Sequence, residues 1–400
     1  MKKLFTILII TFIAIFGLSS CSDEAFDVES VNKQTILIFM PWSGSDSRSG
    51  LYHDFVTNLT DIKAGIINNK GLKGTRVLVF LSQPTGTGSI TSNLYELQYN
   101  STTKEVDDVM LDSYEKKEFT TDADITQILN EVKEKAEALN YAMIIGGHGS
   151  GWTSKEDWQD YPNYAKSHNI STRFFGSVDD IAQYGIDVST LAKGIENSGV
   201  KMQYILFDAC YMENVETAYE LRNATNYLIG STSEILASGM PYSSIWSYLN
   251  SATPSYTSIV TGFNNYYKNL SNPYGSLSAV DCRQVEKLAV LMKEINEKYT
   301  IDGEKLKGVQ KLDGFQSTIF YDLGNYVDSL VPTGYLKEQF QNQLKQTVKS
   351  AQSTDKIIST LYSTTYIDVK DFSGLTISDP STHPAAMRGK EKTAWWKATH

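Results

Sequence analysis

Short runs of apolar residues recur through the first 230 positions of the chain. Each run is apolar at consecutive positions instead of at every second one, which is typical of strands buried on both faces in a parallel sheet. Five such runs stand out, at residues 35–40, 75–81, 141–146, 204–208 and 227–230. We therefore expect a parallel sheet that is covered by helices on both sides.

Helical periodicity follows between some of these runs. Apolar residues recur at intervals of three and four through residues 124–139 and 187–198, as on the buried face of a helix. Asp187 and Ser189 are candidates to cap the second helix, and Gly199 is placed to end it. The alternation predicts an α/β fold, an α/β/α sandwich with a mostly parallel central sheet, in which ligands bind at the carboxyl ends of the strands.

The remaining patterned segments indicate smaller additions to this sheet. Residues 92–109 alternate between apolar and polar positions, which predicts an antiparallel hairpin. Amphipathic helices are expected at residues 283–299 and 335–350, and a single strand-like segment at residues 365–379.

The N-terminus resembles the signal peptide of a bacterial lipoprotein. Two lysines precede an apolar stretch at residues 4–18 that is too short to span a membrane, and the sequence Leu-Ser-Ser-Cys follows, ending at Cys21. In a lipoprotein this cysteine is acylated and becomes the first residue of the mature chain. The alternative is an ordinary secretory signal that happens to contain a cysteine.

These observations predict four parts. They are a lipoprotein signal peptide at residues 1–20, the acylated Cys21 with a polar tether at residues 21–33, an α/β core at residues 34–250, and a C-terminal extension of helices and strands packed on the core at residues 251–400. The protein is then lipid-anchored in the cell envelope. By analogy with lipoproteins of Gram-negative bacteria, we expect it at the outer membrane, with surface exposure as a further option.

Charge and composition narrow the range of partners. The 36 Lys and Arg residues against 46 Asp and Glu residues give a formal charge of −10, which argues against a nucleic-acid partner and favours basic peptides or proteins. The five histidines are scattered, so a dedicated zinc site is not expected. We expect a monomer that requires no cofactor.

His148 and Cys210 carry the candidate chemistry. Each lies where a strand-like apolar run breaks into a turn, and two parallel strands that end at the same sheet edge would bring them together. A thiol becomes a good nucleophile as the thiolate, which a neighbouring imidazole generates near neutral pH. The alternatives are a buried packing cysteine and a capping or surface histidine. Glycines around the histidine favour the catalytic hypothesis because they allow close backbone approach to a ligand; they are Gly146, Gly147, Gly149 and Gly151.

At these residues the chain resembles the clostripain family of cysteine peptidases, which has a caspase-like α/β/α fold. The most specific matching segments are residues 148–152, His-Gly-Ser-Gly-Trp, and residues 207–212, Phe-Asp-Ala-Cys-Tyr-Met. Further matches lie at residues 231–234, 239–242, 276–281 and 373–378. The resemblance covers most of the chain, from about residue 33 to residue 396.

The resemblance implies a role for each candidate residue. His148 would act as catalytic base and acid and Cys210 as nucleophile, while the backbone amides of Gly149 and Cys210 would form the oxyanion hole. The family generally cleaves after Arg or Lys with an acidic pocket, for which Asp208 is the candidate; a strand-end Asp that caps a neighbouring turn is the alternative. Ser233 and Glu234 match a further substrate-binding segment.

Two features of the sequence differ from the pattern of the family. Residues 235–238 are Ile-Leu-Ala-Ser, where family members often have another acidic residue or a proline, so the pocket is expected to hold one carboxylate fewer and the preference between Arg and Lys stays open. Cys282 stands where the family tends to have an aliphatic residue, and we interpret it as part of the core.

Family members are typically zymogens cut within the loop between His and Cys. Here residues 153–185 form a long polar stretch, a length that is usually functional. Arg173 is the first candidate for autocleavage and Lys166 the second. Calcium dependence occurs in some family members. An acidic cluster in this stretch could support it, but we expect these residues to be solvated loop carboxylates. The cluster consists of Asp157, Asp160, Asp179 and Asp180.

Two other functions remain open from the sequence alone. A non-catalytic lipoprotein could use a caspase-like scaffold to bind a peptide or a glycan, because a fold does not determine a function. Transpeptidase or amidase chemistry could use the same Cys-His pair, if an amine outcompetes water for the acyl-enzyme.

Overall fold

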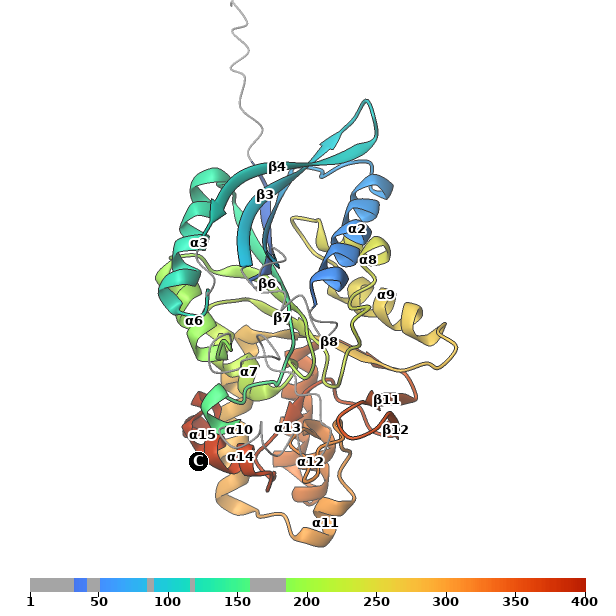
Figure 1. The fold of residues 1–400 in the computed structure, drawn as a ribbon. Coiled ribbons are helices and arrows are strands. Elements are labelled where there is room, and N and C mark those ends of the chain that lie inside the picture. The colour runs from blue at the N-terminus through green and yellow to red at the C-terminus, as the bar shows by residue number, and fades with distance from the viewer. Residues whose placement is uncertain (1–31, 42–50, 85–89, 116–118, 159–184) are drawn as a thin grey trace, which may run out of the picture. The chain divides into compact units, whose positions relative to one another are not determined.

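The computed structural model describes residues 32–41, 51–84, 90–115, 119–158 and 185–400, which belong to the unit of residues 32–400 (Figure 1). The predicted signal peptide, Cys21 and most of the tether lie outside the described residues. No helix among the described residues is long and apolar enough to cross a membrane.

A sheet of nine strands runs through the centre of this unit. The strand order is β10-β8-β7-β6-β5-β1-β2-β3-β4. The five inner strands, from β7 to β2, are parallel, and an antiparallel pair extends each edge. The predicted mostly parallel central sheet is therefore confirmed. The bounds are β1 Gln34–Met40, β2 Thr75–Pro84, β3 Ile90–Asn100, β4 Glu105–Tyr114, β5 Asn140–Gly146, β6 Met202–Asp208, β7 Tyr227–Gly230, β8 Ser276–Asp281 and β10 Val348–Ser353.

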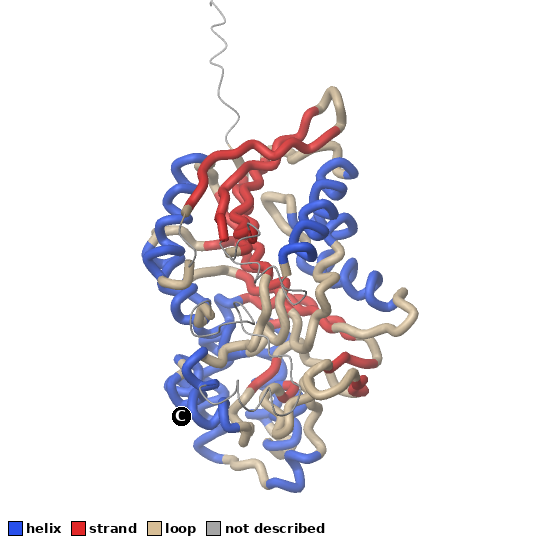
Figure 2. The backbone as a smooth tube through the Cα atoms, in the orientation of Figure 1, coloured by secondary structure: helices blue, strands red, loops and turns tan. Residues whose placement is uncertain are grey.

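Helices cover both faces of the sheet (Figures 1 and 2). One face packs on α2 Tyr52–Asn68, α8 Tyr242–Leu249 and α9 Tyr256–Lys268. The other face packs on α3 Asp122–Lys135, α6 Val188–Asn197, α7 Val215–Glu220 and α10 Val285–Lys298. Alternate residues of β1 enter the two cores, Ile36 and Ile38 on one side and Leu37 and Phe39 on the other, because successive strand side chains point to opposite faces. The α/β/α sandwich is confirmed.

The predicted helix at residues 124–139 is shorter than expected at its C-terminal end. Thr121 and Asp124 form a capping box at its start, and α3 ends at Lys135. Leu139 was expected on the buried face, but it follows the helix and its side chain is 72% exposed. Its backbone amide instead donates to the Asn32 carbonyl, because the chain is already extended toward β5.

The prediction for residues 187–198 is confirmed to within one residue at each end. Gly199, with φ of 72°, follows the last turn of α6 in the left-handed conformation that favours glycine. Asp187 occupies the N-cap position, but its carboxylate accepts no hydrogen bond from α6. It accepts one from the Lys155 backbone amide over 3.0 Å, so it ties the chain before α6 to residues that follow β5.

The antiparallel hairpin is confirmed as β3 and β4, and the C-terminal prediction is right in part. The helix predicted at residues 335–350 ends earlier, as α13 Tyr335–Thr347, because the chain then turns into β10 and pairs with β8. The single strand predicted at residues 365–379 is two short strands with different partners. β12 Thr365–Asp368 pairs with β11 Lys356–Ser359, and β13 Thr376–Ile377 pairs with β9 Tyr321–Asp322.

The C-terminal region shares the central sheet and its cores. β8 and β10 belong to the nine-stranded sheet, and Trp395 of α15 Ala394–Thr399 is fully buried, with its ring edge-on to Tyr219 at 5.8 Å. Residues 251–400 therefore fold as part of the same unit as the core. The remaining α-helices of the described residues are α11 Gly303–Lys307, α12 Leu323–Leu330 and α14 Pro384–Gly389.

Candidate active site

The carboxyl ends of two adjacent strands bring the candidate catalytic segments together. Gly146 of β5 pairs with Asp208 of β6, and the backbone amide of Gly147 donates to the Asp208 carbonyl over 3.3 Å. His148 and Cys210 each follow two residues after this paired position. Both therefore lie at the edge of the sheet where α/β folds bind ligands.

Gly149 lies directly against the backbone of Cys210. A Cβ atom on Gly149 would lie 2.0 Å from the carbonyl oxygen of Cys210 and 2.8 Å from its amide nitrogen. Any side chain at this position would push the two turns apart, so the close approach requires glycine. The backbones of the two residues proposed for the oxyanion hole are neighbours as a result.

A small cavity of about 60 Å³ opens at this point. His148, Asp208 and Cys210 all line it, so the structure brings together the three side chains that the sequence singled out. Other lining residues come from the start of α2 and from the segment that follows β7. The full lining is Leu51, Asp54, Phe55, Asn58, Gly147, His148, Asp208, Ala209, Cys210, Ile235, Leu236, Ala237 and Gly239.

The turn that carries Cys210 has an unusual backbone. Tyr211 has φ of 61°, a left-handed conformation that is costly for a bulky residue and is often found at functional sites. Its backbone amide donates to the Ser233 carbonyl over 3.0 Å, and its ring stacks on Phe320 at 5.0 Å. The Cys210 sulfur lies 3.4 Å from both the amide nitrogen and the carbonyl oxygen of Ile235. Nothing in the sequence signalled the Tyr211 conformation.

Asp208 places a carboxylate at the base of the cavity. Its Oδ2 accepts hydrogen bonds from the Tyr242 hydroxyl at 2.8 Å and the Met240 amide at 3.2 Å, while its buried Oδ1 has no hydrogen-bond partner among the described residues. Burial raises the pKa of Asp208 to about 6, and the two hydrogen bonds oppose that shift. One oxygen therefore supports the turn before α8, as the capping alternative anticipated, and the other remains to meet a ligand.

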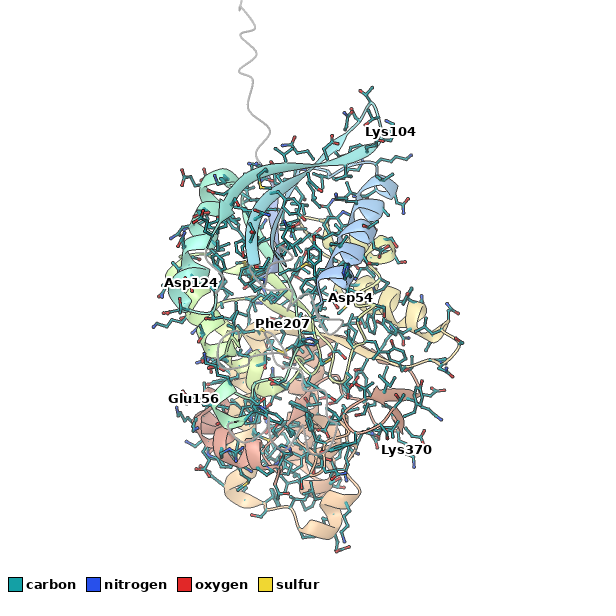
Figure 3. All side chains as sticks on the ribbon, in the orientation of Figure 1. Asp54, Lys104, Asp124, Glu156, Phe207 and Lys370 are labelled. Carbon is teal, nitrogen blue, oxygen red and sulfur yellow. The ribbon has the colours of Figure 1, made fainter. Side chains whose placement is uncertain are left out.

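Asp54 adds a second carboxylate that the sequence did not reveal. It lies in the first turn of α2 (Figure 3) and lines the same cavity. Burial raises its pKa, and the neighbouring His53 opposes the shift. The sequence analysis also missed Asn58 and Phe55 of α2. They lie about 90 residues or more before His148 in the chain, and only the tertiary fold places them beside it.

Ser233 and Glu234 do not line the cavity. Ser233 is fully buried, with its hydroxyl 2.9 Å from that of Ser276. The Glu234 carboxylate accepts hydrogen bonds from the side chains of Tyr211, Ser359 and Thr360 and from the Thr360 amide, at 2.7–3.1 Å. Their placement does not support the substrate contact expected for these two residues, because both side chains are occupied within the protein.

Replacing Glu234 with alanine is expected to destabilise the protein by about 2–4 kcal/mol. The substitution leaves several buried donors without an acceptor and removes the link between the Tyr211 turn and residues 359–360. Chemical denaturation of the variant and the parent measures this difference. A loss below about 0.5 kcal/mol would show that water or neighbouring groups replace the carboxylate.

The acidic residues considered for calcium are only partly described. Asp157 is 2% exposed, pairs with Lys392 at 3.1 Å and accepts a hydrogen bond from the Ser154 hydroxyl at 2.8 Å. The expectation of a solvated loop carboxylate is therefore wrong for Asp157, because the C-terminal residues pack over it. The other members of the cluster, and both autocleavage candidates, lie outside the described residues; they are Asp160, Asp179, Asp180, Arg173 and Lys166. Within the described residues, no group of three or more His, Cys, Asp or Glu side chains is arranged to hold a metal ion.

Cys282 is confirmed as a core residue. It is 1% exposed, and burial raises the pKa of its thiol far above the ordinary value. No disulfide joins Cys282 to the candidate nucleophile Cys210.

Comparison with known proteins agrees with the family resemblance found in the sequence. The family model described as Peptidase_C11, Clostripain family, matches residues 43–379. A secreted C11 cysteine protease from Bacteroides thetaiotaomicron, called iotapain, is 39% identical over 92% of this chain and 99% of that chain, with a TM-score of 0.82. A comparison with curated proteins found no match.

Two further solved structures are similar. A clostripain from Bacteroides thetaiotaomicron in complex with the peptide inhibitor BTN-VLTK-AOMK is 47% identical over 55% of this chain and 96% of that chain, with a TM-score of 0.53. An inactive zymogen C11 protease from Parabacteroides distasonis is 24% identical over 92% of this chain and 98% of that chain, with a TM-score of 0.75, and supports the fold alone.

Proposed function

Since this chain belongs to the clostripain family of cysteine peptidases, we propose that it cleaves peptide bonds after Arg or Lys with a Cys210–His148 dyad. The observation that carries this proposal is the single cavity lined by His148, Cys210 and the buried carboxylate of Asp208. Membership of a cysteine protease family also argues against the alternative of a non-catalytic scaffold that binds a peptide or a glycan.

In the proposed mechanism, His148 takes the proton from the Cys210 thiol and the thiolate attacks the carbonyl carbon of the scissile bond. The backbone amides of Gly149 and Cys210 donate to the oxyanion that forms, a contribution of about 2.7–4 kcal/mol per donor in acyl-transfer sites. His148 then returns the proton to the leaving amine, which leaves an acyl-enzyme. Water attacks this thioester and releases the second product.

Specificity for a basic residue would come from Asp208, supported by Asp54. A lysine ammonium or arginine guanidinium beside Asp208 would compensate the cost of burying that carboxylate. Two carboxylates at one cavity also offset the acidic residue that is absent from residues 235–238. The similar clostripain with 47% identity was solved with an inhibitor that contains the peptide VLTK, which supports a basic residue at the cleavage point.

The rate of cleavage after lysine is expected to fall as the pH drops below about 6. Asp208 must be ionised to bind a cation, and its pKa in the free enzyme is about 6, so kcat/KM should fall up to tenfold per pH unit below that value. A matched peptide with norleucine in place of lysine controls for titration of the dyad. The ratio of the two kcat/KM values should therefore decline below pH 6, and a ratio that stays constant from pH 7 to pH 5 would contradict this role for Asp208.

We also propose that the enzyme is made as a zymogen and is activated by autocleavage after Arg173 or Lys166. The length and polarity of residues 153–185, and the chain's membership of a family whose members are typically zymogens, support this. N-terminal sequencing of the fragments identifies the site, and a fully active enzyme that remains one intact chain would refute the proposal.

Anchoring through an acylated Cys21, which would place the enzyme in the cell envelope, remains a proposal from the sequence. Mass spectrometry of the mature N-terminus tests it. Calcium binding is a further option for the acidic cluster defined above, which precedes β6. Dialysis against a chelator, followed by an activity assay, tests whether the enzyme needs calcium.

A panel of fluorogenic peptides tests the function. Peptides that end in Arg, Lys, norleucine, Asp or Ala differ only at the residue before the cleaved bond. We expect turnover of the Arg and Lys peptides, and product masses in the presence of an added amine separate hydrolysis from transpeptidation. Absence of turnover, even after the 153–185 stretch has been nicked and calcium added, would refute the peptidase proposal.

A further inference from the structure

A second pocket, of about 130 Å³, lies apart from the catalytic cavity and shares no lining residue with it. We call it the Glu216 pocket. Four of its residues are acidic, one is a lysine, and the remainder are small, polar or apolar. It is lined by Trp152, Ser154, Asp157, Asp187, Val188, Ser189, Glu216, Glu220, Gly389, Lys392 and Thr393.

Glu216 is the residue that requires explanation. It lies in the first turn of α7 and is only 2% exposed. Its Oε1 accepts a hydrogen bond from the Ser378 amide over 2.7 Å, but its buried Oε2 has no hydrogen-bond partner within the described part of the chain. An unpartnered buried carboxylate oxygen costs free energy of folding and is uncommon in native proteins. Glu216 lines the pocket, which offers space for a cation beside this side chain.

The charges around Glu216 favour a cationic partner. Asp157 is already paired with Lys392, and Asp187 accepts a hydrogen bond from the Lys155 amide. Glu220 lies at the rim, partly exposed. Among the described residues, Lys392 is the one basic side chain that lines the pocket, so the described acidic groups outnumber the basic ones.

Two further charged groups lie behind Glu216. The Lys390 ammonium donates to the carbonyl oxygens of Asp379 and Ser381, while the Asp379 carboxylate repels that of Glu216. Burial, with this repulsion added, raises the pKa of Glu216 to about 8. The raised pKa favours the protonated form of Glu216, and a bound cation would favour its ionised form.

The size and walls of the pocket distinguish between kinds of cation. Calcium takes six or more oxygen ligands, and no metal-holding group of acidic or histidine side chains exists among the described residues. The volume holds about four water molecules, or a short alkyl chain with a charged end. Trp152 and Val188 provide apolar surface for such a chain, and the Trp152 ring can also contact a cation.

We propose that the Glu216 pocket binds an ammonium group, with the Glu216 carboxylate as its counter-charge. This inference does not depend on the proposed cleavage specificity. Hydrogen bonds connect the pocket to both segments of the active site. Trp152 belongs to the segment that carries His148, and its indole N–H donates to the Ser378 hydroxyl. The Ser378 amide in turn donates to Glu216, which follows Cys210 by six residues.

The test is a calorimetric titration of the full-length chain with n-butylammonium. A Cys210→Ala, Asp208→Asn background prevents turnover and removes the cation site proposed for the catalytic cavity. We expect saturable binding that Glu216→Gln weakens about tenfold or more, because Gln keeps the acceptor for Ser378 but loses the charge. Glu220→Gln, at the rim, is the matched control and should change the affinity less than about threefold.

Proton release provides a second measurement, which does not require the Glu216→Gln variant to fold. At pH 7, binding of butylammonium should release close to one proton, seen as a dependence of the heat on the ionisation enthalpy of the buffer, because Glu216 must ionise. Absence of saturable binding at millimolar concentrations, equal binding of n-butanol, or binding without proton release would overturn the proposal.

The source of the ammonium group is resolved by three probes. Nα-acetyl-lysine methylamide carries it on a side chain, alanine amide carries it at an N-terminus, and cadaverine carries it on a free diamine. Preferential binding of any one supports the pocket and identifies its natural class of ligand. Binding of none, where butylammonium also fails, contradicts it. The fluorogenic panel on the wild-type chain is independent of this result, so the two proposals can fail separately.

Discussion

Replacing Cys210 with alanine is expected to lower kcat/KM for peptide cleavage by at least about 10⁴-fold. The sulfur is the only protein atom in the proposed mechanism that forms a covalent bond with the substrate, and removal of a nucleophile in comparable triads leaves only the contribution of substrate binding and the oxyanion hole. His148→Ala is expected to cause a loss of similar size, and the double variant little more, because the two residues act as a unit. Steady-state assays with the best peptide of the panel measure all three.

The controls separate chemistry from folding. Cys210 is buried against Ile235, so loss of its sulfur could also loosen the turn; Cys210→Ser keeps nearly the same shape while the weaker nucleophile removes most of the activity. Unchanged thermal unfolding of the serine variant, with activity lost, assigns the effect to the nucleophile. Residual activity above about 1% in Cys210→Ala would instead place the nucleophile elsewhere.

The central strands could be predicted from the sequence because each of them is buried on both faces. All five apolar runs correspond to parallel strands, with ends within a few residues of the expected positions. Their order could not be predicted, since β5 lies beside β1 although β2, β3 and β4 separate them in the chain. Sequence periodicity reports burial, whereas strand order depends on contacts between distant segments.

Three helices on one face escaped the sequence analysis for identifiable reasons. α2 buries residues at helical spacing, but Asn58 and Gly65 interrupt its apolar stripe. Gly65 is required there, because a Cβ would lie 2.6 Å from the Cβ of Trp246 on α8. α8 is only eight residues long, and α9 carries many Tyr and Asn residues. A stripe adapted to close packing against another helix has little apolar contrast along the sequence.

Some residues of the candidate site could be predicted from the sequence and others could not. His148, Asp208 and Cys210 follow strand ends, and the parallel sheet alone places such positions at one edge. Asp54 reaches the cavity from the first turn of α2, and no local pattern distinguishes it from an ordinary acidic residue in a first helical turn. Glu234 is the reverse case, because the sequence suggested a substrate contact that its placement does not support. It lies in a segment typical of the family, but hydrogen bonds from residues 359–360, more than a hundred positions away, occupy its carboxylate.

Asp208→Asn is expected to change specificity more than catalysis. Without the buried negative charge, kcat/KM for the lysine peptide should fall about 10²- to 10³-fold, as when one partner of a buried charge pair is removed. The norleucine peptide, which has no charge to lose, should change less than about threefold. The asparagine side-chain oxygen can still accept from the Tyr242 hydroxyl and the Met240 amide, so the turn before α8 should keep its structure.

Asp54→Asn is the matched comparison at the other side of the cavity. Its carboxylate is more exposed, so screening by solvent should limit the loss with the lysine peptide to about tenfold or less. A large effect at Asp208 with a small one at Asp54 would assign the specificity to the buried carboxylate and leave Asp54 as a supporting charge. Equal losses with the lysine and norleucine peptides in Asp208→Asn would instead mean that Asp208 orients the end of β6, and with it Cys210, and that the basic residue of the substrate is recognised by another group.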